Sequence, residues 1–141
     1  MADPTVTISW GELFDRLSIL EIKRERLSSE SSRTTVDAQL SRLNLVARSV
    51  DLSSPKLSEL RTRLKSVNER LWTIEDEIRA HEAREAFDAH FIELARSVYR
   101  NNDERNRLKR AVDELLGSES EPKAYAPYTE HKAAPGSGGC P

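Results

Sequence analysis

A repeat of apolar residues at steps of three and four runs almost unbroken from residue 55 to residue 116. Its first half comprises Leu57, Leu60, Leu64, Val67, Leu71, Ile74 and Ile78, and its second half comprises Phe91, Leu94, Val98, Leu108, Val112 and Leu115. Steps of three and four place side chains on one face of a helix. The repeat therefore predicts two long amphipathic helices, whose apolar faces must be buried against other helices.

The apolar repeat is interrupted between its two halves, because the next positions on the same helix face carry polar residues. We therefore place a reversal of the chain near Ala86. One continuous rod is the alternative, because no glycine or proline marks the turn. After such a reversal, Asp88 is suited to cap the second long helix, and Phe87 is suited to pack on Ile92 as a hydrophobic staple. The two helices then form an antiparallel hairpin of the coiled-coil type.

Two shorter helices are predicted before the hairpin. Ser9 and Glu12 have the spacing of a capping box, in which Ser9 accepts from a backbone N–H of the first turn and Glu12 reaches back. A serine-rich stretch over 28–34 predicts a loop between the first and second helices, and residues 5–8 have the composition of a minor strand. We expect helices near 10–27, 35–50, 55–85 and 89–116.

Local signals also mark helix ends and domain limits. Ser54 and Pro55 suit the start of the first long helix, and Gly117 suits the end of the second. At 141 residues the chain has the length of one domain. We predict an extended lead over 1–8, a single all-α antiparallel helical bundle over 9–117 and a flexible tail over 118–141. Within that tail, Tyr125 and Tyr128 are candidates to dock on the bundle.

Composition narrows the classes of function. The formal net charge is −2 and the isoelectric point is near 6.0, so no excess of basic residues indicates a nucleic-acid partner. No apolar run approaches the roughly 20 residues of a membrane span, and no apolar leader opens the chain. We expect a cytoplasmic protein without membrane insertion. The one cysteine, Cys140, rules out an intramolecular disulfide.

The sequence contains no recognisable motif for catalysis or cofactor binding. His81, Glu82 and His90 flank the predicted turn, but they lack the His-Glu-x-x-His and Glu-x-x-His spacings of metal sites. Gly11 is the only glycine before Gly117, so there is no glycine-rich phosphate loop. No serine lies in a Gly-x-Ser-x-Gly elbow. We expect no metal and no cofactor, and we assign no catalytic residue.

Polar residues along the hairpin are the candidates for a binding site. A reversal near Ala86 places Trp72 opposite Asn101, to within one helical turn. One stripe of the first long helix carries Trp72, Asp76 and Arg79, and one stripe of the second carries Arg96, Tyr99, Asn102 and Asp103. Arginine forks, an amide and aromatic rings suit a planar or anionic ligand.

The same stripes have a second interpretation, which stays open. They suit ion pairs between helices that set register, with the aromatic rings as flanking core. Asn101 and Arg105 stand where the repeat calls for apolar residues. A polar residue in an apolar seam commonly selects register or oligomeric state, so these two positions favour the structural interpretation.

Three longer motifs carry a resemblance to a known family. They span Gly11–Lys23, Leu71–Arg79, and Leu94–Tyr99 with the following Asn102–Arg105. They are similar to motifs of a family of small bacterial all-helical proteins of unknown function, encountered near glycosyltransferase and lipopolysaccharide genes. The resemblance covers about residues 5–125. It implies a ligand- or partner-binding site at Asp15, Lys23, Trp72, Asp76, Arg79, Arg96, Tyr99, Asn102, Asp103 and Arg105.

Three functions follow from these observations. We favour a non-catalytic helical module that binds a partner protein or a small anionic ligand through the polar flank of the hairpin. The resemblance implies a role in surface-polysaccharide biosynthesis, with a glycosyltransferase as a possible class of partner. A purely structural homo-oligomerisation coiled coil and a small mutase-type helical enzyme are the alternatives. An apolar flank left uncovered on the hairpin predicts a homodimer.

Overall fold

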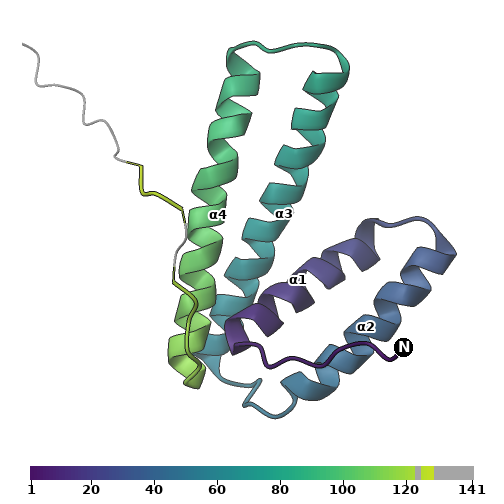
Figure 1. The fold of residues 1–141 in the computed structure, drawn as a ribbon, viewed down its shortest axis with the longest axis vertical. Helices are drawn as coiled ribbons and strands as arrows, with labels where there is room; N and C mark the ends of the chain where they lie inside the picture. The colour runs from purple at the N-terminus through teal and green to yellow at the C-terminus, as the bar shows by residue number, and fades with distance from the viewer. Residues whose placement is uncertain (123–124, 129–141) are drawn as a thin grey trace, which may run out of the picture.

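The computed structural model describes residues 1–122 and 125–128. This part of the chain contains four helices and no strand: α1 (Trp10–Arg26), α2 (Glu30–Ala47), α3 (Pro55–Ala83) and α4 (Ala89–Leu116) (Figure 1). α3 and α4 form the long antiparallel hairpin, α1 packs against both of them, and α2 packs on α1. The predicted all-α bundle built on a long hairpin is confirmed. Over these residues, no helix combines the length and the apolar character needed to cross a bilayer.

The predicted capping residues begin and end the helices. The side chains of Ser9, Ser54 and Asp88 each accept a hydrogen bond from the backbone N–H three residues later. α4 ends at Gly117, whose φ of 77° lies in the left-handed region that glycine adopts without strain. These ends agree with the sequence because a cap depends on the geometry of one helical turn.

α2 begins earlier than expected, and the predicted loop over 28–34 is wrong. Ser29 caps the helix, which starts at Glu30. The hydroxyl of Thr34 donates to the carbonyl of Glu30 at 2.9 Å, so a segment rich in hydroxyl side chains satisfies them within the helix itself. α2 also ends earlier than expected, at Ala47.

The minor strand expected over 5–8 is also wrong. Residues 1–9 have no regular secondary structure and are mostly exposed. A strand needs a neighbour for its backbone hydrogen bonds, and the described part of the chain contains no other strand.

The chain reverses between α3 and α4 as predicted, so the alternative of one rod is excluded. Without a glycine in the turn, Glu85 adopts a φ of 55°, a conformation that costs a side chain about 1–2 kcal/mol. Phe87 packs edge-on against Phe91, with ring centroids 5.2 Å apart. Ile92, the expected staple partner of Phe87, is 58% exposed.

The apolar core lies where α1 crosses the hairpin, towards the lower end in Figure 1. It comprises Leu13, Phe14, Leu17 and Leu20 of α1, Val36, Leu40 and Ala47 of α2, Leu57, Leu60, Leu64 and Val67 of α3, and Leu108 and Val112 of α4. Towards the tip of the hairpin, Leu71, Ile74 and Ile78 continue the repeat but are only partly buried.

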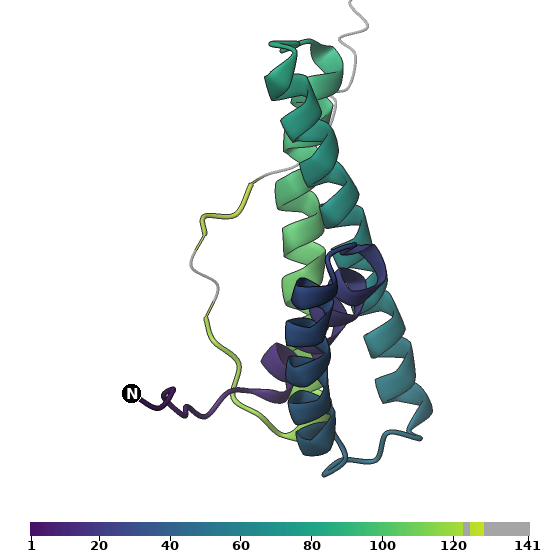
Figure 2. The ribbon, with the colours of Figure 1, turned by 90° about the vertical axis from the view of Figure 1, so that its right-hand side faces the viewer.

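The segment after Gly117 turns back beside α4 and bows away from that helix (Figures 1 and 2). The ring of Tyr128 meets the ring of Tyr99 edge-on, with centroids 5.0 Å apart, which confirms the expected docking of Tyr128. Tyr125 is 81% exposed. Cys140 lies outside the described residues.

Candidate functional site

A polar cluster is buried where α1 crosses α3 and α4. Arg105 of α4 donates to the carboxylate of Asp15 on α1 from two nitrogens, at 2.9 and 2.5 Å. Asn68 of α3 donates to the same carboxylate at 2.9 Å and to the hydroxyl of Ser18 at 2.8 Å. That hydroxyl donates to the backbone carbonyl of Asp15 at 2.7 Å. Four side chains therefore tie three helices together at one point.

The two charges in this cluster, those of Arg105 and Asp15, neutralise each other. Hydrogen bonds from Arg105 to Asp15 raise the pKa of the arginine and outweigh the burial that opposes its charge. Both oxygens of the Asp15 carboxylate already accept from donors of the fold itself, Arg105 and Asn68. The cluster therefore sets how the helices cross, in the way that buried polar groups specify register.

A second polar junction fastens the start of α1 to the end of α4. The backbone N–H of Gly11 donates to the buried carboxylate of Asp113 at 2.7 Å, and the backbone N–H of Trp10 donates to the hydroxyl of Ser118 at 3.1 Å. The hydroxyl of Ser120 donates to the second oxygen of Asp113 at 2.9 Å. A carboxylate also suits the partial positive charge of a helix N-terminus.

Gly11 allows this close approach of the two helices. A Cβ at this position would lie 2.3 Å from the carbonyl oxygen of Lys109 and 2.8 Å from a carboxylate oxygen of Asp113. Beside it, the ammonium of Lys109 pairs with the carboxylate of Glu12. Glu12 therefore pairs with a residue of α4 and does not reach back to the backbone N–H of Ser9. The expected capping box is only half formed, because the ion pair with Lys109 is the stronger interaction for the Glu12 carboxylate.

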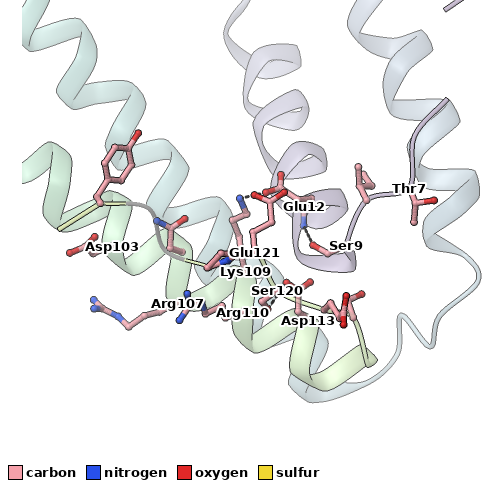
Figure 3. Close-up of a pocket in the computed structure, with 16 residues that line it drawn as sticks. Thr7, Ser9, Glu12, Asp103, Arg107, Lys109, Arg110, Asp113, Ser120 and Glu121 are labelled. Carbon is pink, nitrogen blue, oxygen red and sulfur yellow. Dashed lines mark hydrogen bonds and ion pairs between the residues drawn. The ribbon is translucent and has the colours of Figure 1, made fainter. Parts of the chain in front are cut away.

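A groove of about 660 Å³, which we term the α4 groove, opens beside this junction (Figure 3). α4 contributes one side, and the N-terminal lead and the segment after α4 contribute the others. Its lining consists of Thr7, Ile8, Ser9, Glu12, Asp103, Asn106, Arg107, Lys109, Arg110, Asp113, Ser118, Glu119, Ser120, Glu121, Pro122 and Tyr125.

Both signs of charge line the α4 groove, with five acidic and three basic residues. Two of the basic side chains, Arg107 and Lys109, already pair with glutamates. The third, Arg110, is exposed and forms no ion pair with any residue in 1–122 or 125–128. Glu119 and Glu121 are likewise exposed. The groove therefore offers charges of both signs to a ligand from outside.

The structure distributes the ten expected site residues over several places. Asp15 and Arg105 meet in the buried cluster. Asp103 lines the α4 groove. Lys23 of α1 and Asn102 of α4 are partly exposed.

Arg96 and Tyr99 lie together on α4. A hydrogen bond with Tyr99 raises the pKa of Arg96, as does the charge of Glu93, which the guanidinium contacts at 3.2 Å. The ring of Tyr99 in turn holds Tyr128. This part of the expected site therefore faces the segment after α4.

The α3 stripe makes other contacts. The guanidinium of Arg26, at the end of α1, lies 5.7 Å from the ring centroid of Trp72. Arg79 pairs with Glu75 one turn earlier on the same helix, at 3.3 Å, and Asp76 is exposed. These residues therefore contact α1 and their own helix, whereas the α4 stripe contacts α4 and the following segment.

The register of the hairpin is within the expected helical turn. Asn101 of α4 accepts a hydrogen bond from Arg70 at 3.0 Å, two residues from the expected Trp72. His81 and His90 flank the turn, with ring centroids 5.1 Å apart. Among residues 1–122 and 125–128, no three His, Cys, Asp or Glu side chains group as a metal ion would require.

Sequence reasoning missed Gly11, Asn68 and Asp113. Gly11 carried a usable signal, because a lone glycine inside a helical pattern often marks a close approach of backbones. Asn68 and Asp113 are each the residue directly after an apolar member of the repeat, Val67 and Val112. Polar residues at such positions are common on solvated flanks, so only the fold reveals that these two are buried.

Comparison with known families identifies the chain. The model of a family of unknown function, DUF6165, matches residues 4–133, so the chain belongs to that family. The predicted membership in a family without an established activity is therefore confirmed. No curated protein and no solved structure matches the chain significantly.

Proposed function

We propose that this member of a family of unknown function is a non-catalytic binding module, and that the α4 groove binds a segment of a partner protein. One observation carries the proposal: a groove of about 660 Å³ runs along the C-terminal half of α4 and offers charged side chains of both signs. Grooves of this volume are within the range of ligand sites. Arg110, Glu119 and Glu121 have charges that are not paired within the described chain.

The charge balance favours a protein segment over a small anion. Five acidic residues outnumber three basic ones in the lining, and Arg107 and Lys109 are committed to Glu104 and Glu12. A small anion would therefore meet one uncommitted guanidinium among several carboxylates. A peptide with charges of both signs can match Arg110 and the glutamates at once.

The placement of the core cation supports a binding role over the mutase-type alternative. A helical mutase needs cationic side chains that project into the bundle core and hold a dicarboxylate. Arg105 is the arginine that reaches the buried polar cluster here, and Asp15 already accepts from its Nε and from one of its Nη atoms. The resemblance to proteins encountered near polysaccharide genes suggests a glycosyltransferase as the partner and surface-polysaccharide biosynthesis as the process.

Site-specific photo-crosslinking in the cell of origin tests the proposal. A photoreactive residue replaces Asn106, which lines the α4 groove, or Arg42, an exposed residue of α2 that serves as the control. We expect one discrete protein adduct from position 106, none from position 42, and a loss of that adduct when Arg110→Glu is added. Equal adducts from both positions, or none from position 106, would reject the groove as the binding surface.

A second proposal is that the tip half of the hairpin pairs with a second copy of the chain. The apolar repeat is fully buried at Leu57 and Leu64 but only partly buried at Leu71, Ile74 and Ile78, towards the tip of the hairpin. A helical seam with the same repeat can cover this face in an isologous contact. Sedimentation at micromolar concentration should give a dimer; a species of 16.0 kDa at all concentrations would refute the pairing.

A further inference from the structure

Two arginines in the described chain are partly buried, Arg61 of α3 and Arg105 of α4, while all others there are exposed. Burial of a guanidinium is costly unless an opposite charge accompanies it. Arg105 has the carboxylate of Asp15. Arg61 lies over the ring of Phe14, 5.1 Å from its centroid, and pairs with no carboxylate in residues 1–122 or 125–128. Its charge is therefore partly buried without a carboxylate of the described chain to balance it.

Arg61 lines a cavity of about 330 Å³ between α1 and α3, which we term the Arg61 pocket. The pocket shares no lining residue with the α4 groove. Ser58 and Ser66 also line it, and their hydroxyls make no hydrogen bond within the described chain. Thr62 lies beside them, but its hydroxyl already donates to the carbonyl of Ser58 at 3.0 Å. Two uncommitted hydroxyl donors thus accompany the guanidinium.

The second cation of the pocket is already neutralised. Lys65 contacts Glu25 at 2.6 Å and Glu21 at 3.7 Å. The hydrogen bond to Glu25 raises the pKa of Lys65 despite its partial burial, and Glu21 and Glu69 add to the effect. The two parts of the pocket therefore differ in charge: carboxylates surround Lys65, and the positive charge of Arg61 is not paired within the described chain.

The contact with the ring of Phe14 also holds the guanidinium in place. A guanidinium that lies over a ring keeps its N–H donors at its edge, where they can form two parallel bonds with one oxyanion. The cavity volume is at the lower end of the range found for small-molecule sites. The cavity has room for an oxyanion such as phosphate, and its donors and charge suit one.

We propose that the Arg61 pocket binds an oxyanion, a phosphate or carboxylate group, through the guanidinium of Arg61 with help from one hydroxyl of the lining, that of Ser58 or Ser66. This site is independent of the partner-binding role proposed for the α4 groove. The bound group supplies the counter-charge that Arg61 lacks, and it joins α1 to α3 beside the ion pairs of Lys65 with Glu21 and Glu25.

Titration of the full chain with inorganic phosphate, and separately with acetate, tests the proposal at constant ionic strength. Calorimetry and the thermal midpoint are the two readouts, since a ligand of the native state raises the midpoint. The test variant is Arg61→Gln, and the matched control is Arg63→Gln, an exposed arginine of the same helix that pairs with Glu104 at 2.9 Å. The two anions distinguish a phosphate site from a carboxylate site.

We expect saturable binding of one of the two anions by the natural chain and by Arg63→Gln, and binding weaker by about tenfold or more in Arg61→Gln. Arg61→Lys keeps the charge without the fork and should bind with intermediate strength, and it replaces Arg61→Gln if that variant fails to fold. Absence of saturable binding to the natural chain, or equal binding by the Arg61 variants and the Arg63 control, would overturn the proposal.

Discussion

Arg105 of α4 holds Asp15 of α1 with two parallel hydrogen bonds, at 2.9 and 2.5 Å, across a sequence separation of 90 residues. The aspartate is 3% exposed, whereas the arginine side chain retains 29% exposure. The good geometry of such an ion pair lowers the free energy of the folded state, while the desolvation of its charges raises it. Its main effect is therefore to disfavour any other crossing of the two helices.

Asp15→Ala should destabilise the fold by about 3 kcal/mol, because it leaves Arg105 without its counter-charge and removes one of the two acceptors of Asn68. Urea denaturation measures the change. The control is Asp37→Ala, which removes an exposed ion pair with Arg24 and should cost about 0–1 kcal/mol. If the two substitutions lowered the free energy of unfolding by the same amount, the burial of the Asp15–Arg105 pair would have no effect on its contribution to stability.

Gly11→Ala should cost about 1–3 kcal/mol, since the added methyl group would stand 2.3 Å from the carbonyl oxygen of Lys109 and push α1 away from α4. Hydrogen exchange should then become faster at the backbone N–H groups of residues 10 and 11. Gly117→Ala meets open space but a φ of 77°, so it should strain only the end of α4 and leave exchange at Trp10 unchanged. If the backbone N–H groups of residues 10 and 11 stayed protected from exchange in Gly11→Ala, the role of this glycine in the close approach of α1 and α4 would be contradicted.

Arg79→Ala and Arg96→Ala should both leave the thermal midpoint unchanged, because each side chain is exposed and pairs only within its own helix. Their effects on partner capture should differ. Arg96, Asp103 and Arg110 follow each other at seven-residue steps, which places them on one face of α4, beside the groove. Arg96→Ala should weaken photo-crosslinking from position 106, and Arg79→Ala should not; the opposite pattern would move the site to α3.

Asp88 should make the start of α4 sensitive to acid. The backbone N–H of Phe91 lowers the pKa of Asp88 below its ordinary 3.8, and the nearby His81 adds to the effect. A carboxyl group whose pKa is lower in the folded state stabilises the fold above pH 3.8, and this contribution disappears as the pH falls through the lowered pKa. In NMR titrations, amides of the first turn of α4 should shift with Asp88. In Asp88→Asn that titration should vanish, and its persistence would assign the shift to another group.

Periodicity and capping residues were sufficient to predict most of the fold. The apolar repeat identified both long helices. Ser9 marked the start of α1, and Ser54, Asp88 and Gly117 marked ends of the long helices, because helix faces and caps depend on residues within a turn or two of each other. The loop over 28–34 was misjudged for a related reason. Serine and threonine have weak helix propensity, and the packing of α2 on α1 outweighs it.

The candidate sites depended on the tertiary structure. The sequence singled out Asp15 and Arg105 separately, yet their pairing requires the crossing of helices 90 residues apart. Likewise, nothing near Arg61 in the sequence distinguishes it from Arg63, two residues later on the same helix. The fold places Arg61 over Phe14 beside a cavity and Arg63 at the surface beside Glu104. Helical periodicity assigns a residue to a face, but only the packing of other helices determines which faces lose water, and the cost of burying a charge follows from that packing.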